Sequence, residues 1–310
     1  MADVPLTVKK YIGQVLDAAK PLVKSDLSRL SGLADGDLEF LKQGWKDTEV
    51  KQRRKIVSEL RELTMKNLSL DFSRIFLFCI SDPDAKVRAE AILGIGEEED
   101  ENLTSAFIGV LENDGSAEAR AASASALGRL VMQGELGKIS EQKTEMVYHA
   151  LLAALDKQGE AMKVKNAALE AIAPLSKPRV RGLIEQAYHS DNADTRISAI
   201  TAMGLNCNRM WLPALTEELH SEGDDFRLAA VMALGELAEE DAVLYLIDVV
   251  QDENPKIQEQ AILAMGEIGG EEARNILNAL VKDPDQHIRR TAKTALKVLE
   301  SCEGPLSLNS

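Results

Sequence analysis

The residues that could do chemistry in this chain are few and far apart. Its three cysteines, Cys79, Cys207 and Cys302, form no CxxC pair and no Cys/His spacing typical of a metal site. The sequence also contains no P-loop, no Rossmann glycine pattern and no Gly-x-Ser-x-Gly elbow. Because neither a nucleophile with its base nor a cluster of metal ligands is recognisable, we predict a non-catalytic protein with no catalytic residues, no metal and no cofactor.

The charge of the chain limits the classes of partner. Of its 310 residues, 51 are acidic and 36 are basic, which gives a formal net charge of −15. Such a charge opposes binding to phosphate backbones and to anionic membranes, and it favours basic partners. No stretch is long and apolar enough to span a membrane. We therefore predict a cytoplasmic protein that binds neither nucleic acid nor membrane; the alternative for the acidity is that it serves only solubility.

A fixed period of 31 residues runs through the second half of the chain. Its anchor positions are Arg196, Arg227, Gln258 and Arg289. Each anchor is followed by alanine after three residues and by Met or Leu after seven, and the first three are followed by glycine after eight. Periods of this size are typical of solenoids, in which copies of one small unit stack. We predict an all-α fold, an α–α superhelix of stacked antiparallel helical hairpins.

The unit is clearest between residues 242 and 266. Ala242 to Val250 has the pattern of a first helix, and Asn254 with Pro255 begins a second helix that runs to Gly266. We expect Gly266, with Gly269 and Gly270 beyond it, to end this helix. Short polar residues that can accept from the free N–H groups of the first helical turn recur four residues before an anchor. These predicted caps are Asp84, Ser116, Asn192, Asn254 and Asp285.

The anchor arginines have a structural interpretation. An arginine one turn into the second helix faces the turn between helices, where Asp84 lies four residues before Arg88. We predict that such pairs fix the register of each turn and do not bind a substrate. Alanine or glycine six residues after each anchor leaves a narrow stripe, which lets neighbouring second helices approach closely.

These units resemble the HEAT repeat. The resemblance is carried by segments such as Asp283–Ala292 (DPDQHIRRTA) and Arg227–Glu236 (RLAAVMALGE), and it is closest to the bacterial variety of phycobilisome-lyase-like proteins. It extends from about Asp71 to Leu299. The resemblance implies a curved solenoid whose second helices line a concave face. It also implies a scaffold or adaptor, because the family is mainly non-catalytic.

The resemblance also supplies enzyme alternatives. Hydroxylases of HEAT-like fold bind iron through His-Glu pairs, but none of the four histidines here precedes a glutamate. DNA glycosylases of this fold need a basic groove with aromatic residues, which an acidic chain with 4% aromatic residues does not offer. Bilin lyases have no sharp motif that could exclude them. A lyase-like or chaperone-like protein acting on a cofactor-bearing or modified protein is therefore the alternative function.

Irregularities in the pattern divide the chain. We predict that residues 1–70 form an N-terminal helical cap with a divergent repeat, the alternative being a helix that lies on a membrane. Residues 71–300 form the HEAT-like array, with an irregular unit and an insertion near 131–175, where the anchor spacing lengthens to 45 residues. Residues 301–310 are predicted to be a disordered tail, and the acidic run 97–101 a solvated loop.

A partner-binding surface is predicted on the second helices. Positions two, five and nine residues after each anchor face away from the packed side, and there apolar residues stand beside acidic ones. An apolar floor with an acidic rim suits a partner protein that presents a basic helix or an extended peptide; the alternative is that these apolar residues pack under the adjacent repeat. The predicted residues are Glu90, Leu93, Glu97, Arg129, Glu170, Leu205, Met232, Glu236, Leu263 and Glu267.

Overall fold

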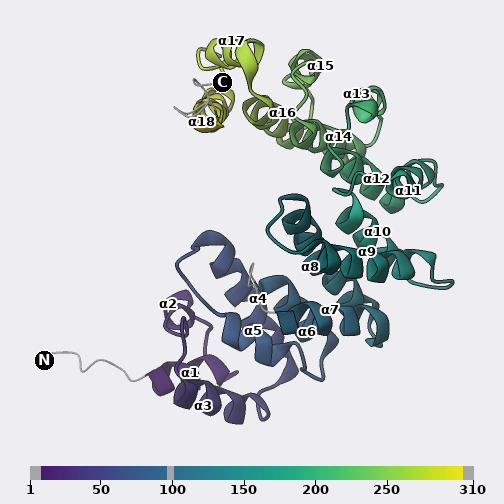
Figure 1. The fold of residues 1–310 in the computed structure, drawn as a ribbon. Helices are drawn as coiled ribbons and strands as arrows, with labels where there is room; N and C mark the ends of the chain where they lie inside the picture. The colour runs from purple at the N-terminus through teal and green to yellow at the C-terminus, as the bar shows by residue number, and fades with distance from the viewer. Residues whose placement is uncertain (1–7, 96–100, 303–310) are drawn as a thin grey trace, which may run out of the picture. The chain divides into compact units, whose positions relative to one another are not determined.

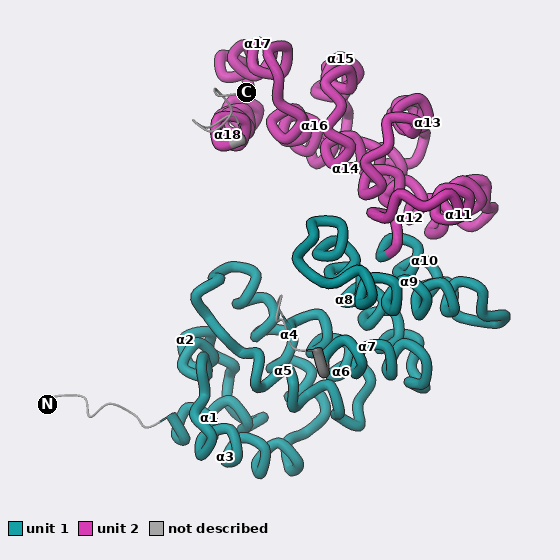
Figure 2. Tube along the Cα trace, viewed as in Figure 1, with its two compact units in different colours: residues 1–171 teal, residues 172–310 magenta. Residues whose placement is uncertain are grey.

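The fold of the chain is entirely helical in the part that the structure, a computed structural model, describes. That part comprises residues 8–95 and 101–302, and all of its regular elements are helices (Figure 1). The chain divides into two compact units, residues 1–171 and residues 172–310 (Figure 2). The predicted all-α solenoid of helical hairpins is confirmed. The boundaries expected at residues 70 and 300 stay predictions.

The first unit begins with a helix that covers its end. α1 packs against α2 and α3, and it buries Ile12 and Val15. Its second helices α4, α6 and α8 pack successively on one another. The helices of this unit are α1 (Val8–Leu16), α2 (Lys24–Ser28), α3 (Asp35–Trp45), α4 (Val50–Lys66), α5 (Ser73–Cys79), α6 (Ala85–Gly94), α7 (Glu101–Asn113), α8 (Ala117–Glu135), α9 (Glu141–Asp156) and α10 (Met162–Ile172).

The residues that lengthen the repeat near 131–145 extend the helices of the first unit. α8 has 19 residues and α9 has 16, against 10 in α6. Most of the predicted acidic loop, including Glu97, lies outside the described residues, as does most of the predicted tail. α18 of the second unit includes Ser301 and Cys302, so the helix takes in the first two residues of that tail.

The second unit is the most regular part of the chain. α12, α14, α16 and α18 pack successively on one another, and each also packs against the first helix of its own hairpin. Its elements are α11 (Pro178–Tyr188), α12 (Ala193–Leu205), the 3-10 turn η1 (Arg209–Trp211), α13 (Leu212–Glu218), α14 (Asp224–Leu237), α15 (Ala242–Val249), α16 (Pro255–Ile268), α17 (Gly270–Leu280) and α18 (Gln286–Cys302).

Helix caps follow the sequence prediction. At each predicted position the side-chain oxygen accepts a hydrogen bond from a backbone N–H of the first turn, at 2.6–3.2 Å. Each such bond satisfies a donor that the helix itself leaves unpaired, which stabilises the helix by about 1 kcal/mol. The confirmed caps are Asp84, Ser116, Asn192, Asn254 and Asp285.

Small residues allow the second helices to stack closely, as predicted. A Cβ built on Gly204 would lie 2.6 Å from the Cα of Ala233, and one on Gly266 would lie 2.6 Å from the carbonyl oxygen of Ala295. Of the glycines expected to end this helix, Gly266 lies inside α16, which continues to Ile268, and Gly269, whose φ is 75°, is the C-cap. Gly266 is needed for packing, and Gly269 for the turn.

The anchor arginines connect successive hairpins, but not through the predicted partner. Arg88 donates to both carboxylate oxygens of Asp114 in the next inter-helix turn, at 2.7 and 2.8 Å, and to two backbone carbonyls of its own turn. Arg227 bonds Asp252 in the same way. Asp84, the expected partner of Arg88, instead pairs with Arg54 of α4 at 2.6 Å. The Arg88–Asp114 and Arg227–Asp252 ion pairs therefore each join a hairpin to the next one along the chain.

Candidate protein-binding surface

The second helices of the second unit position five of the predicted binding residues. α12, α14 and α16 are held in register by their caps and by the glycine contacts, so equivalent positions recur from helix to helix. Two residues after their anchors, Ser198 and Ala229 are buried and Gln260 is half-buried. We define the surface column as the predicted residues that lie five or nine residues after an anchor in this unit. Its members are Leu205, Met232, Glu236, Leu263 and Glu267.

The apolar residues of this column differ in exposure. Met232 is 53% exposed, whereas Leu205 and Leu263 are half-buried. The partial burial of the two leucines agrees in part with the alternative that these residues pack under the adjacent repeat. The exposure of Met232 agrees with a partner-binding surface, and its flexible thioether side chain is suited to contact with a partner.

The column contains two acidic residues besides Met232 and the leucines. Glu236 and Glu267 are exposed at equivalent positions of α14 and α16, and Glu267 covers Gly235, where an added Cβ would lie 2.6 Å from its Oε2. Partial burial raises the pKa of Glu267, and the nearby charge of Glu236 raises it further. Within the described part of the chain neither carboxylate has an ion-pair partner. The two carboxylates therefore form an uncompensated acidic pair.

The predicted residues of the first unit are arranged differently. Glu90 is half-buried and forms an ion pair with Arg61 of α4 at 3.1 Å. Arg129 donates to the carbonyl oxygen of Ile95 at 2.8 Å. Leu93 and Glu170 are half-buried. Because the charged groups of Glu90 and Arg129 already bind partners within the protein, these two residues do not form a rim like that of Glu236 and Glu267.

Sequence reasoning missed a second concave feature. A pocket in the first unit lies between α3 and α5, within residues 38–83, largely upstream of the regular repeat. The signal that could have indicated it is the pair Lys42 and Lys46, four residues apart on one helix face, followed by an aromatic-rich segment that ends with Phe78. These residues carry no periodic pattern, so only the packing of α3 and α5 brings them together.

Part of the second unit matches a known repeat family. Residues 212–297 match the sequence model of a family described as HEAT repeats. This chain contains HEAT repeats. The residues matched are those of α13 to α18, where the caps, anchors and packing glycines are most regular. A search of curated protein sequences finds no match to this HEAT-repeat chain.

Solved structures extend the likeness over nearly the whole chain. The complex of CpcE and CpcF of phycocyanin lyase from Nostoc sp. PCC7120 aligns with a TM-score of 0.55 at 14% identity, covering 97% of this chain and 96% of that one. Human deoxyhypusine hydroxylase aligns with a TM-score of 0.37 at 21% identity, covering 95% of this chain and 96% of that one. Yeast importin-β aligns at 0.47 with 13% identity, covering 97% of this chain and 47% of its own. The predicted HEAT-repeat fold, an all-α solenoid, is confirmed.

Two observations concern other kinds of site. Among the described residues, no group of three or more histidine, cysteine, aspartate or glutamate side chains is placed to hold a metal ion. No helix in residues 8–95 or 101–302 is both long and apolar enough to cross a bilayer.

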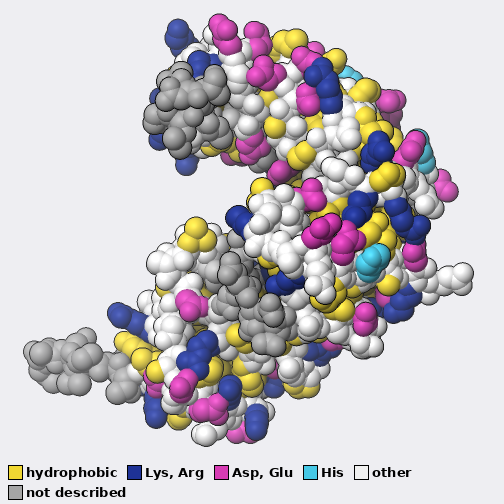
Figure 3. All heavy atoms as spheres, in the orientation of Figure 1, with side chains coloured by type: hydrophobic (Ala, Val, Ile, Leu, Met, Phe, Trp, Pro, Cys, Tyr) yellow, Lys and Arg dark blue, Asp and Glu magenta, His cyan; other side chains and the backbone are white. Residues whose placement is uncertain are grey.

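On the face drawn in Figure 3, acidic and basic side chains are interspersed, with hydrophobic side chains between them.

Proposed function

We propose that this HEAT-repeat chain is a non-catalytic interaction scaffold whose second unit binds a basic helix or extended peptide of a partner protein. The binding surface is the column of Leu205, Met232, Glu236, Leu263 and Glu267. The observation that supports this proposal is the acidic pair Glu236 and Glu267, which shares the column with the half-exposed Met232 and has no basic partner among the described residues.

The electrostatics of the acidic pair favour a cationic ligand. Two carboxylates that repel one another, one of them partly desolvated, destabilise the free surface. A lysine or arginine placed between Glu236 and Glu267 would replace this repulsion with two attractive interactions and lower the raised pKa of Glu267. An apolar side chain next to that cation would cover Met232. A basic amphipathic helix offers both groups at the spacing of one helical turn.

The experiment is affinity capture with the full chain from native lysate at low and high salt, followed by mass spectrometry. Capture is then repeated with the double variant Glu236→Lys and Glu267→Lys. A matched control carries Glu253→Lys and Glu300→Lys, which change the net charge equally at two exposed positions away from the column. We expect a salt-sensitive partner that the control retains and the column variant loses. Equal recovery by both variants would contradict the proposal.

The lyase-like alternative rests on the same fold. The CpcE and CpcF complex is described as a phycocyanin lyase, and its likeness to this chain at 14% identity extends to the fold alone. A visible absorbance spectrum of the captured fraction separates the two functions. A colourless partner protein favours the scaffold, whereas a bound chromophore would favour a protein that acts on a cofactor-bearing substrate.

A further inference from the structure

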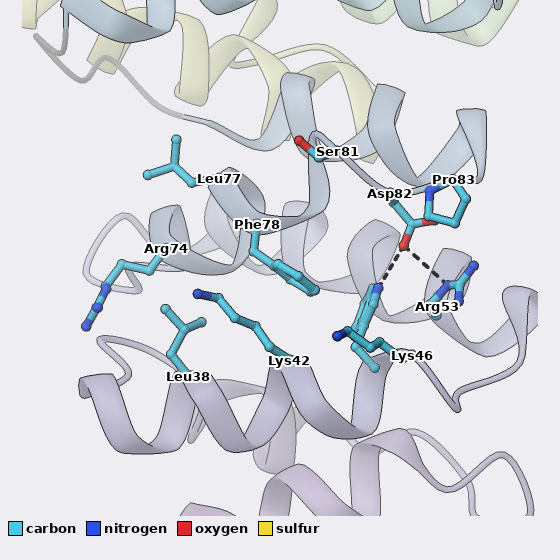
Figure 4. Close-up of a pocket in the computed structure, with 11 residues that line it drawn as sticks. Leu38, Lys42, Lys46, Arg53, Arg74, Leu77, Phe78, Ser81, Asp82 and Pro83 are labelled. Atoms are coloured by element: carbon cyan, nitrogen blue, oxygen red, sulfur yellow. Dashed lines mark hydrogen bonds and ion pairs between the residues drawn. The ribbon is translucent and has the colours of Figure 1, made fainter.

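A pocket of about 690 Å³ opens in the first unit between α3 and α5 (Figure 4). Its volume is within the range of sites that bind small molecules or single inserted side chains. It uses none of the residues of the proposed binding column. The residues that line it are Leu38, Lys42, Trp45, Lys46, Arg53, Arg74, Leu77, Phe78, Ser81, Asp82 and Pro83.

The one acidic residue of the pocket is fully occupied by neighbouring groups. Asp82 is buried, and its Oδ2 accepts from the indole Nε1 of Trp45 at 2.8 Å and lies 3.3 Å from Nε of Arg53 (Figure 4). Its Oδ1 accepts from the backbone N–H of Asp84 at 2.8 Å. Because Arg53 neutralises this carboxylate, Asp82 does not offset the other basic residues of the pocket.

The walls of the pocket are apolar and aromatic. Phe78 and Trp45 meet edge to face, with ring centroids 6.1 Å apart. Leu38 and Leu77 lie opposite one another across the opening in Figure 4. Such walls accommodate an aromatic or large aliphatic side chain, which gains free energy when it leaves water.

The rim of the pocket is cationic. Of the four basic residues among the eleven that line it, Arg53 is buried against Asp82 and Arg74 pairs with Asp35, which leaves Lys42 and Lys46 as the charges of the rim. The Lys42 ammonium lies 5.9 Å from the ring centroid of Phe78, and Lys46 is exposed. Lys42 also contacts Glu39 at 2.7 Å, but that carboxylate is 60% exposed, and water screens such an exposed ion pair so that it contributes little. A ligand carboxylate can therefore replace Glu39 at little cost.

We propose that this pocket binds an acidic peptide. The peptide inserts one aromatic or large aliphatic side chain between Leu38, Leu77 and Phe78, and it places a carboxylate against Lys42 and Lys46. Charge complementarity selects this occupant, because a cationic rim around an apolar floor excludes the basic ligand proposed for the second unit. The chain would then carry two sites of opposite charge preference, one in each unit, as an adaptor between two partners requires.

The test uses the full chain, fluorescently labelled, on an array of short synthetic peptides. In one series a central residue is varied through all types between flanking aspartates, and in the other the flanks are asparagines. We expect binding in the aspartate series where the centre is Phe, Trp, Tyr or Leu, at least about tenfold stronger than in the asparagine series. The absence of any binding in the aspartate series, or equal binding in both series, would overturn the proposal.

Variants assign the binding to this pocket. The double variant Lys42→Glu and Lys46→Glu should weaken binding of the best peptide about tenfold or more, while Lys138→Glu with Lys163→Glu, an equal charge change at exposed positions elsewhere in the unit, should not. Circular dichroism verifies that both variants fold. An equal loss of peptide binding in the two double variants would show that the peptide responds only to overall charge, and it would refute binding in this pocket. The variant Glu236→Lys with Glu267→Lys should bind the peptide normally, so this test is independent of the proposed function.

Discussion

Replacing a packing glycine by alanine tests the repeat interface most directly. Gly182 and Gly204 belong to the two helices of one hairpin, α11 and α12, and both have helical conformations. A Cβ on Gly182 would meet no atom within 4 Å, whereas one on Gly204 would lie 2.6 Å from Cα and 2.8 Å from the carbonyl oxygen of Ala233. The same substitution should therefore have opposite effects at the two positions.

The magnitudes follow from two competing terms. Alanine in place of glycine inside a helix stabilises by about 0.5–1 kcal/mol, because the unfolded chain loses conformational freedom. At Gly204 this gain opposes an overpacking cost of about 1–3 kcal/mol, because the backbone of α14 must move away. We expect Gly182→Ala to raise the free energy of unfolding by about 0.5–1 kcal/mol and Gly204→Ala to lower it by about 1–2 kcal/mol.

Urea denaturation followed by circular dichroism measures both changes. Repeat arrays can unfold in more than one step, so the m-value of each variant must match that of the parent before midpoints are compared. The double variant Gly204→Ala with Ala233→Gly should not regain stability, because the close contacts at Gly204 include backbone atoms of residue 233. If Gly204→Ala proves as stabilising as Gly182→Ala, the inferred close contact between α12 and α14 is refuted.

Two further predictions concern the ionic contacts between hairpins. Arg227→Leu should lower the free energy of unfolding by about 2 kcal/mol, because Asp252 and two backbone carbonyls lose their donor. The control Arg290→Leu, at an exposed position, should change the free energy of unfolding by under about 0.5 kcal/mol. Equal urea midpoints for the two variants would contradict a stabilising role of the Arg227–Asp252 ion pair. Burial raises the pKa of Glu160, but hydrogen bonds from Arg120, the Ala161 N–H and Lys157 outweigh this and hold the pKa at about 2, below its ordinary 4.5. The ionised form therefore stabilises the fold fully above pH 4.5, and this contribution is lost as the pH falls toward 2. Glu160→Gln should lower the urea midpoint at neutral pH, and it should make the midpoint depend less on pH between 4.5 and 2. A pH dependence equal to that of the parent would contradict the stabilising role of ionised Glu160.

Local features of the fold were predictable because they depend on neighbours in the sequence. An N-cap needs only a short acceptor side chain at the start of a helix, so the caps Asp84 and Asn254 can be predicted from the four residues that follow them. The stripe of small residues was predictable for a similar reason, since a 31-residue period repeats one helix face. The sequence did not show which glycine ends α16, because glycine serves both close packing and helix termination. Gly266 and Gly269 can be told apart only by what a side chain would meet and by the backbone angle.

The candidate surfaces depended on contacts that the sequence does not encode locally. The repeat pattern assigned Glu90, Glu236 and Glu267 alike to the predicted binding surface, yet Glu90 pairs with Arg61, while Glu236 and Glu267 have no ion-pair partner among the described residues. The partner of each side chain comes from the helix that packs beside it, about one repeat away. The repeat period alone therefore could not tell an occupied carboxylate from a free one.

The sequence by itself determined that this protein is a stack of helical hairpins with HEAT-repeat character, because period, caps and small-residue spacing are properties of one unit copied along the chain. Only the tertiary structure decided which hairpin each arginine joins, which carboxylates stay unpaired, and that α3 and α5 enclose an apolar pocket with a cationic rim. The physical reason is that burial and ion pairing are set between helices far apart in sequence. In the pocket, Trp45 and Asp82 meet across 37 residues.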